Sequence, residues 1–306
     1  MPGSEFTFRA DDGRSLFARR WLPEGRSRAA VQIAHGLTEH SGRYARLARA
    51  LNEAGYAGYA NDHRGHGPKT PPADLGHFAD KGGWDKVVGD LWTFNRLIAA
   101  EQPSAPIIFL GHSLGSFLGR GFIARHSDAL AGVALSGSSG RPPMIATLGR
   151  LIAREERLRL GRRGKSDPIL QMWFGDFNKP FKPARTAFDW LSRDEGEVDA
   201  YVADPFCGFP FTTQLAIDVL DALPHVTSPA SLAPIRKDLP IYVFSGERDP
   251  VGANIKGLIA DLKAAGFTRL TTRLYPGARH ETLNETNRDE VTRDLIAWLD
   301  GLTPPK

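Results

Sequence analysis

Three side chains of this sequence have the types needed to cleave an acyl bond: Ser113, Asp249 and His280. Ser113 stands at the centre of a Gly-x-Ser-x-Gly pattern at residues 111–115. A serine hydroxyl is a weak nucleophile at neutral pH, so it needs an imidazole within hydrogen-bond reach and a carboxylate that orients the imidazole. The pattern therefore predicts a nucleophilic serine, provided that the rest of the chain supplies both partners.

The order of residues along the chain narrows the choice of acid and base. In one known arrangement the acid follows the nucleophile and the histidine comes last. Of the nine histidines, His280 alone lies after Asp249, which follows an apolar stretch at residues 241–244. Asp238 precedes a predicted strand and Asp261 lies within a predicted helix, so both are worse placed. We therefore predict Asp249 as the acid and His280 as the base; a solvated turn carboxylate is the alternative for Asp249.

A tetrahedral intermediate also needs two backbone donors for its oxyanion. The amide of Leu114, next to Ser113 at a predicted helix start, is the first candidate. The amide of Leu37, in the loop after an early strand, is the second. A backbone donor requires no particular side chain, so position alone supports these two predictions.

Apolar stretches precede the candidate residues and are typical of buried strands. Helix-spaced apolar residues follow Ser113, and the same alternation of strand and helix runs through both ends of the chain. A hairpin is expected within residues 6–21, and strands are predicted at residues 29–34, 56–60, 107–110, 132–136, 239–245 and 270–275. This alternation favours a mostly parallel, doubly wound α/β sheet, in which sites form at the carboxyl ends of strands. Asn287 and Glu290 suggest a capping box for the last helix.

The alternation stops between residues 140 and 236, where aromatic residues, prolines and charges are mixed. A stretch of this length is too long for an ordinary connection. We therefore predict a core formed by residues 1–139 and 237–306. Residues 140–236 are predicted to be a helical cap, inserted after the strand that follows the nucleophile helix.

Composition and charge exclude several classes of protein. The chain has 306 residues, a net charge of +4 and a single cysteine, Cys207, which excludes internal disulfides and thiolate metal clusters. Residues 141–165 hold seven Arg and one Lys against two Glu, so the rest of the chain is net negative, unlike a general nucleic-acid binder. The N-terminus lacks a signal-peptide pattern and no apolar run is long enough to span a membrane. A cytoplasmic location is expected.

Five motifs, in this order, resemble those of the α/β-hydrolase family of monoacylglycerol lipases and lysophospholipases, of bacterial type. They lie at residues 35–44 (His-Gly-Leu-Thr-Glu-His-Ser-Gly-Arg-Tyr), 62–67, 111–115, 246–251 and 277–281. The resemblance implies the α/β-hydrolase fold. It also implies Ser113 as nucleophile, Asp249 as acid and His280 as base, with the amides of Leu37 and Leu114 as the oxyanion hole. The inserted cap would then shape an acyl pocket, and no cofactor or metal is expected.

The function expected from these residues and this resemblance is that of a serine carboxylester hydrolase. The substrates would be water and a single-chain acyl ester such as a monoacylglycerol or lysophospholipid, from which a fatty acid is released. An esterase, thioesterase or lactonase with the same triad is an alternative, because fold and triad do not fix the substrate. A hydrolase-like binding protein without turnover is a further alternative.

Two groups of histidines suggest a metal-dependent mechanism as an alternative hypothesis. His63 and His66 flank a short loop, and His35 and His40 lie in a neighbouring one. The His-x-His-x-Asp-His pattern of some metal hydrolases is absent, which favours a hydrogen-bonded loop that braces the site. No catalytic role is expected for His112.

The predicted cap carries two ambiguous patterns. Leucines 148, 151 and 158 alternate with arginines, which suggests either a solvated cap helix or peripheral contact with anionic lipid at the inner membrane surface. Six aromatic residues either line an acyl tunnel or form the core of the cap: Trp173, Phe174, Phe177, Phe181, Phe188 and Trp190.

Overall fold

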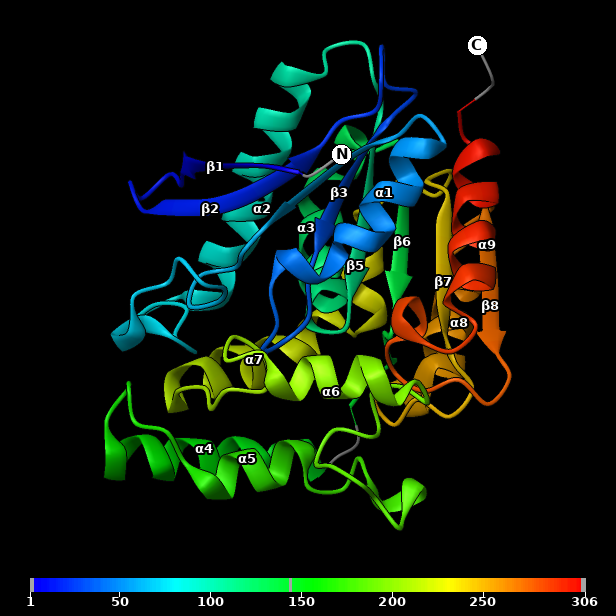
Figure 1. Ribbon diagram of the computed structural model, residues 1–306. Coiled ribbons are helices and arrows are strands. Elements are labelled where there is room, and N and C mark those ends of the chain that lie inside the picture. The colour runs from blue at the N-terminus through cyan, green and yellow to red at the C-terminus, as the bar shows by residue number, and fades with distance from the viewer. Residues whose placement is uncertain (1–2, 143–144, 304–306) are drawn as a thin grey trace.

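An eight-stranded sheet organises the chain in a computed structural model that describes residues 3–142 and 145–303 (Figure 1). The strand order is β1-β2-β4-β3-β5-β6-β7-β8. Strand β2 pairs antiparallel with β1 and β4, whereas the pairings from β4 across to β8 are parallel. The strands are β1 (Ser4–Arg9), β2 (Ser15–Trp21), β3 (Ala30–Ala34), β4 (Ala57–Asn61), β5 (Ile107–His112), β6 (Gly132–Ser136), β7 (Ile241–Gly246) and β8 (Leu270–Tyr275).

The inner strands are apolar because helices cover both faces of the sheet. Every residue of β3, β4, β5, β6 and β7 is buried, as expected where a parallel sheet has no solvent-facing side. The predicted strands are confirmed, with ends that differ by at most two residues. The predicted mostly parallel α/β sheet is confirmed as well.

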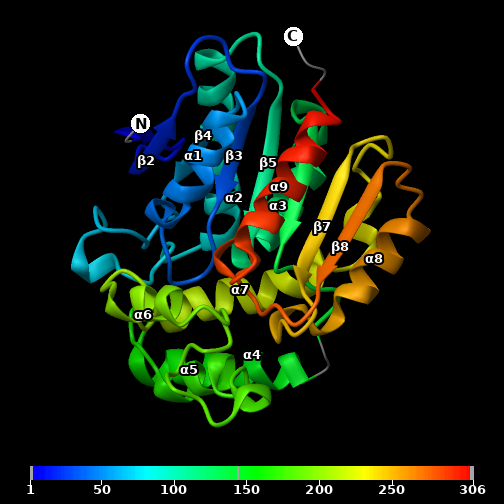
Figure 2. The same cartoon turned by 45° about the vertical axis from the view of Figure 1, so that its right-hand side comes forward.

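Two groups of helices enclose the sheet (Figure 2). Helices α1 (Ala45–Glu53) and α9 (Arg288–Asp300) share one apolar cluster with one face of the sheet. Helices α2 (Gly83–Glu101), α3 (Leu114–His126) and α8 (Ile255–Ala264) contribute to the larger cluster on the other face. The short 3₁₀ helices are η1 (Ser41–Tyr44), η2 (Pro72–Asp74), η3 (Ser127–Ala129), η4 (Lys179–Phe181), η5 (Pro229–Leu232), η6 (Val251–Asn254) and η7 (Thr282–Asn284).

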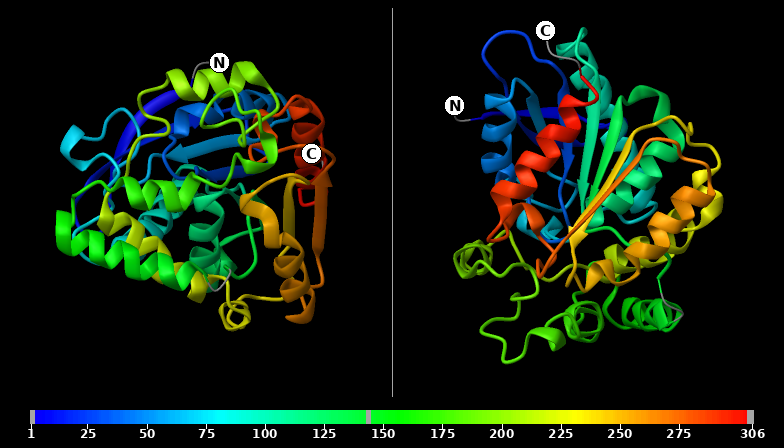
Figure 3. Two further views of the ribbon diagram at one scale, coloured as in Figure 1. Left: turned by 90° about the horizontal axis from the view of Figure 1, so that it is seen from below. Right: turned by 90° about the vertical axis from the view of Figure 1, so that its right-hand side faces the viewer.

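Four further helices lie across the carboxyl ends of the strands, below the sheet in Figure 1 and towards the viewer in the left panel of Figure 3. They are α4 (Ile145–Leu160), α5 (Asp167–Phe174), α6 (Glu195–Ala203) and α7 (Thr213–Val226). Helix α7 packs on α4 and also on α2 and α3, so it joins this helical layer to the core.

The predicted capping box at the start of α9 is wrong. The side chain of Asn287 makes no capping hydrogen bond to the helix. Its Nδ2 donates to Glu290 Oε2 at 2.9 Å, and its Oδ1 accepts from Arg193 Nη2 at 3.1 Å. The side chain therefore links the start of α9 to a residue of the inserted segment.

Candidate active site

Ser113 occupies a strained turn between β5 and α3. Its backbone has φ 51° and ψ −120°, a region that residues with a side chain rarely adopt. The turn is held because Ser113 N donates to Ser136 O at 2.9 Å, and Ser116 N donates to Ser113 O at 2.9 Å. The side chain of Ser113 lies at the end of the strand and lines a cavity.

The glycines around this turn are required by close approach of neighbouring backbone. A Cβ at Gly115 would clash with the carbonyl oxygens of Ala34 and His35, and one at Gly111 would lie 2.5 Å from the oxygen of Gly115. The Gly-x-Ser-x-Gly pattern therefore has a steric cause, because α3 starts directly against the end of β3.

Asp249 and His280 follow β7 and β8 and are hydrogen-bonded to each other. His280 Nδ1 lies 2.9 Å from Asp249 Oδ1, and both side chains are buried. Asp249 also accepts from Ser245 Oγ at 2.6 Å and from Val251 N at 2.8 Å. These bonds fix the carboxylate, which in turn orients the imidazole with Nδ1 as donor, since the carboxylate can only accept.

Burial and charge act in opposite directions on these two groups. Burial alone would raise the pKa of Asp249, but the imidazole of His280 and the neighbouring donors lower it below the ordinary value. Burial alone would lower the pKa of His280, but the carboxylates of Asp249, Glu281 and Glu39 raise it. The pair therefore favours an ionised carboxylate beside a basic imidazole.

A cavity of about 480 Å³ opens beside Ser113. Four of the five predicted site residues line it, namely Leu37, Ser113, Leu114 and His280. The fifth, Asp249, does not line the cavity but is hydrogen-bonded to His280 Nδ1. Much of the remaining wall is apolar and comes from the helical layer and α3, including Phe117, Met172, Trp173, Phe174, Phe177, Trp190, Val219, Leu220 and Leu223. A polar end next to a long apolar wall suits a polar head attached to a hydrocarbon chain.

The six aromatic residues of the inserted segment fit both interpretations, since three of them line the cavity and also take part in an apolar cluster. Trp173, Phe174, Phe177 and Trp190 line the cavity. An apolar cluster of the same segment contains Phe181 and Trp190, and Phe174, Phe177 and Phe188 pack against it.

The buried histidines of the neighbouring loops each make at least one hydrogen bond, although His63 Nδ1 and His66 Nε2 have no partner within the part of the chain that the structure describes. His35 Nε2 accepts from His63 N at 3.0 Å, and His35 Nδ1 lies 2.8 Å from Gly36 O. Burial lowers the pKa of His63 to about 3 and that of His66 to about 4, so these rings stay neutral. Nε2 of His35 therefore accepts and Nδ1 donates, so both ring nitrogens are engaged, which favours the bracing role over metal binding for this ring.

Among the described residues, one group brings three potential metal-ligand atoms within 4.8 Å of one another, namely His40, Asp204 and Cys207. His40 Nδ1 accepts from Gly42 N at 3.1 Å, so its Nε2 carries the proton that it shares with Asp204 Oδ2 at 2.9 Å. This ring offers no lone pair to a metal. Burial also raises the pKa of Cys207, which keeps the thiol protonated.

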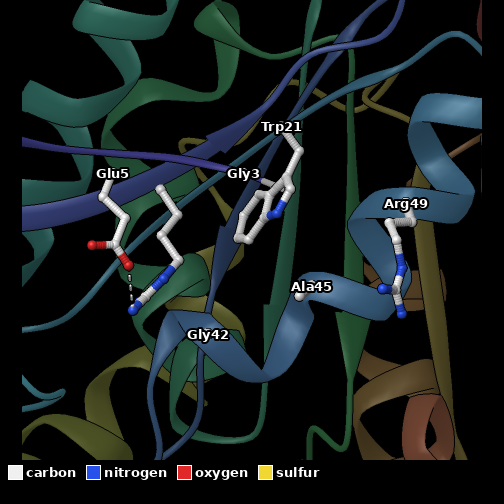
Figure 4. Close-up of a pocket in the computed structure, with 7 residues that line it drawn as sticks. Gly3, Glu5, Trp21, Gly42, Ala45 and Arg49 are labelled. Carbon is white, nitrogen blue, oxygen red and sulfur yellow. Dashed lines mark hydrogen bonds and ion pairs between the residues drawn. The ribbon is translucent and has the colours of Figure 1, made fainter. Parts of the chain in front are cut away.

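A second hollow, of about 580 Å³, lies between the N-terminal hairpin and α1 (Figure 4). Its wall includes the indole of Trp21 and an ion pair between Glu5 and Arg19 at 3.3 Å. The predicted site residues, all of which the structure describes, lie elsewhere. The cavity beside Ser113 is therefore the candidate active site.

Sequence reasoning missed a buried ionic network next to this cavity. Arg43 pairs with Glu39 at 2.9 Å and with Glu281 at 2.6 Å and 2.7 Å. The four-residue spacing of Glu39 and Arg43 was the available signal, but Glu281 lies 238 residues away from Arg43. Thr38, with a positive φ of 52°, was also missed.

Comparison with known proteins shows the family of the chain. The family described as "Serine aminopeptidase, S33" matches residues 25–287. The chain belongs to this family. It is 27% identical to a monoacylglycerol lipase of Mycolicibacterium smegmatis over 308 residues, which covers 97% of this chain and 96% of that protein. It is 28% identical to the human monoglyceride lipase, with 95% and 89% covered.

Solved structures of similar proteins share the fold. A carboxyl esterase from Bacillus coagulans superimposes with a TM-score of 0.90 and 30% identity, and 99% of each chain is covered. A monoglyceride lipase from Saccharomyces cerevisiae, at 20% identity and a TM-score of 0.78, shares the fold. The predicted resemblance to a monoacylglycerol-lipase-like α/β hydrolase, and the α/β-hydrolase fold, are confirmed.

Proposed function

We propose that this chain is a monoacylglycerol lipase or lysophospholipase that releases a fatty acid from a single-chain acyl ester. The observation that carries the proposal is the meeting of Ser113 with the His280–Asp249 pair at the polar end of a largely apolar cavity. The coarser class predicted from the sequence, an ester-hydrolysing serine hydrolase, is confirmed by the lipases and the esterase to which the chain is similar.

The proposed reaction follows from the roles of the three side chains. Ser113 Oγ attacks the ester carbonyl carbon while its proton passes to His280 Nε2. The oxyanion that forms accepts hydrogen bonds from the amides of Leu37 and Leu114. His280 then gives the proton to the leaving alcohol, and the acyl group stays on Ser113.

Water completes the cycle. His280 removes a proton from a water molecule, whose oxygen attacks the acyl carbon, and the fatty acid leaves as Ser113 regains its proton. Throughout, Asp249 holds Nδ1 protonated and stabilises the imidazolium. Acyl-ester substrate and water are the partners that this chemistry requires, and no step uses a cofactor or metal.

Residues 140–236 are proposed to be the cap over the core formed by residues 1–139 and 237–306. The helices of this segment supply most of the apolar wall of the cavity. A chain of methylenes buried against this wall gains about 0.8 kcal/mol per CH₂. We therefore expect the cap to select for acyl length.

Peripheral contact with the inner membrane surface is proposed for α4, in a cytoplasmic protein that does not bind nucleic acid. Leu148, Leu151 and Leu158 are 54%, 59% and 86% exposed, and they recur on one face of the helix. By helical spacing, Arg154 and Arg159 lie on either side of this face, which suits anionic headgroups. In the described part of the chain, no helix is both long and apolar enough to cross a bilayer.

The proposed function is tested by a fluorophosphonate probe together with a substrate panel. The probe should label the wild type and fail to label Ser113→Ala, and labelling that persists in this variant would reject Ser113 as nucleophile. Against monoacylglycerols and p-nitrophenyl esters of graded length, kcat/KM should rise from acetyl to medium or long chains. A steady preference for acetate would instead indicate a small-ester esterase.

A further inference from the structure

The peptide that carries the Leu37 amide is held by a side chain on its carbonyl side. His35 Nδ1 lies 2.8 Å from the oxygen of Gly36, which belongs to the same planar unit as Leu37 N. In a trans peptide the C=O and N–H bonds point in opposite directions. A hydrogen bond that fixes the Gly36 carbonyl therefore also fixes the direction of the Leu37 N–H.

The proton position on His35 follows from its other nitrogen. Nε2 accepts from the backbone N–H of His63 at 3.0 Å, so the proton of the neutral ring lies on Nδ1 and points to Gly36 O. His63 Nε2 lies 3.0 Å from His35 O, which accepts in return. The two rings, with centroids 4.0 Å apart, thus lock each other in one orientation.

The preceding peptide is held by a carboxylate. Gly36 N donates to Glu39 Oε1 at 2.5 Å, and Tyr44 OH donates to the same oxygen at 3.0 Å. A Cβ at Gly36 would lie 2.7 Å from Glu39 Oε1 and 3.2 Å from the Cβ of Ser113, so the loop is packed directly against the nucleophile.

Glu39 connects this loop to the loop of His280. Arg43 Nη1 donates to Glu39 Oε2 at 2.9 Å, and both Nη atoms of Arg43 donate to Glu281, which follows His280 in sequence. All three side chains are largely buried, with exposures of 4%, 12% and 5% for Glu39, Arg43 and Glu281. A bidentate pair of this kind restricts geometry more than a single ionic contact does.

We propose that His35, Glu39 and Arg43 are positioning residues that direct the Leu37 amide towards the oxyanion and hold the loop of Leu37 in a fixed position relative to His280. None of the three needs to touch the substrate for this role. The inference rests on the proposed serine hydrolase function and assigns a task to residues that the triad leaves unused. It also accounts for the Glu39–Arg43 spacing in the motif at residues 35–44.

The role predicts a particular kinetic signature. A donor aimed at the oxyanion acts where charge develops, so its misalignment lowers kcat while KM changes little. Complete loss of an oxyanion-hole donor costs about 10²–10³ in kcat. Loss of a residue that only aims the donor should cost less, about 10- to 100-fold.

The first test compares matched variants at His35 and Glu39 with p-nitrophenyl butyrate. His35→Leu removes the donor, whereas His35→Asn keeps an N–H near the place of Nδ1. Glu39→Met removes the acceptor, whereas Glu39→Gln keeps it. We expect kcat to fall about 10- to 100-fold in the Leu and Met variants with KM within threefold, and to recover at least in part in the Asn and Gln variants.

A reversible boronic acid, which forms a tetrahedral adduct with a serine, provides a second readout. Its Kd should weaken in His35→Leu and Glu39→Met by about the factor lost in kcat. An unchanged kcat, or a loss that appears in KM alone, would overturn the proposal. Because the Leu and Met variants can fail to fold, His35→Asn and Glu39→Gln, verified by circular dichroism, carry the test in that case. A partial fall in kcat that is matched by the loss of boronate affinity, with KM unchanged, would support the proposal, whereas wild-type kcat and boronate affinity, or a loss confined to KM, would overturn it.

The second test changes the charges near His280 and follows the pKa of its imidazole through the pH dependence of kcat/KM. The groups that face its ring are Asp249, Glu281, Glu39 and the neutral ring of His112 at 4.7 Å. Glu39→Gln removes a negative charge and should move the acid limb of kcat/KM to lower pH. Arg43→Met removes a positive charge and should move it to higher pH, whereas Arg43→Lys should leave it in place. Shifts of Glu39→Gln and Arg43→Met in the same direction would overturn the network.

Failure of this inference is distinguishable from failure of the proposed function. If Ser113→Ala retains turnover, the serine hydrolase proposal itself is wrong. If Ser113→Ala is inactive while His35→Leu and Glu39→Met keep wild-type kcat, the positioning role alone is wrong.

Discussion

Two halves of the inserted segment meet the core in different ways. The docked half, residues 185–211, makes backbone contacts to the loop of His280: Trp190 O accepts from His280 N at 3.3 Å, and Leu191 O accepts from Glu281 N at 2.8 Å. The outer half, residues 145–178, packs α4 on α5 and α7 and reaches the core near its middle, where Arg163 pairs with Asp74 at 2.7 Å. It leaves three leucines of α4 exposed.

The docked half also forms hydrogen bonds to the loop of Leu37. Tyr201 OH donates to Thr38 O at 3.0 Å, and Gly208 N donates to the same oxygen at 2.9 Å. Thr38 has a positive φ, which a β-branched residue adopts only when its surroundings hold it there. The two halves therefore differ in their contacts: the docked half bonds to the loops of His280 and Leu37 and lines part of the cavity, whereas the outer half lines another part and carries the exposed leucines of α4.

The sharpest test of this division compares two Asp→Asn substitutions on one cavity. Asp249→Asn should lower kcat by about 10⁴-fold, because the amide no longer enforces the Nδ1–H form of His280. Asp176, which lines the same cavity from the outer half and is exposed, pairs with Lys179 at 2.8 Å. Asp176→Asn should change kcat less than twofold with a medium-chain p-nitrophenyl ester. Comparable losses in both variants would contradict the division.

Stability should show the same asymmetry. Glu285 is fully buried and accepts from Arg193 Nε at 2.9 Å and Arg279 N at 2.8 Å, which ties the docked half to the His280 loop. Glu285→Ala leaves these donors unpaired, so we expect the free energy of unfolding in urea to fall by about 3 kcal/mol. Glu155→Ala on the exposed side of α4 is the matched control, expected within about 0.5 kcal/mol of the wild type. Equal losses would show that the docked contacts carry no special stability.

The pH dependence of activity should respond to charges beside His280 and not to charges on the outer half. As the proposed base, His280 must be neutral to accept a proton, and its pKa is raised above its ordinary value of 6.5. Activity should therefore fall as pH drops through an apparent pKa above 6.5, and this limb should move to lower pH in Asp249→Asn because the carboxylate no longer stabilises the imidazolium. Glu155→Gln should leave the kcat/KM profile unmoved, and a shift there would contradict the prediction.

The smallest effect on chemistry is expected at the outward face of α4. The triple variant Leu148→Ser, Leu151→Ser and Leu158→Ser should hydrolyse a water-soluble ester at a rate within twofold of the wild type, since these side chains are exposed. Its partition onto vesicles that contain anionic phospholipid should fall by at least about tenfold, because burial of each leucine side chain is worth about 1.5–3 kcal/mol. Unchanged partition would remove α4 from the proposed membrane contact.

Much of the fold was predictable because its causes are local. The apolar run before Ser113 and the glycines around it are adjacent in sequence, and they determine a buried strand, a tight turn and a packed helix. Asp249 and His280 were predictable for the same reason, since each directly follows a strand and parallel strands end at one edge of the sheet.

The remainder depends on contacts between distant segments. No periodic pattern links Arg43 to Glu281 or Tyr201 to Thr38, so neither contact could be predicted. The capping box failed because Arg193, 94 residues before Asn287, captures the side chain that would have capped α9. The helices of the inserted segment were predicted only as a class, because their apolar faces pack on one another as well as on the cavity.

The backbone conformation of Ser113 also affects the thermal stability of the enzyme. A non-glycine residue held at φ 51° and ψ −120° raises the energy of the native state by about 1–3 kcal/mol. The unfolded chain is free of this penalty, so the conformation of the proposed nucleophile lowers the thermal stability of the protein. An inactive Ser113→Gly chain should therefore melt at a higher temperature than the active enzyme.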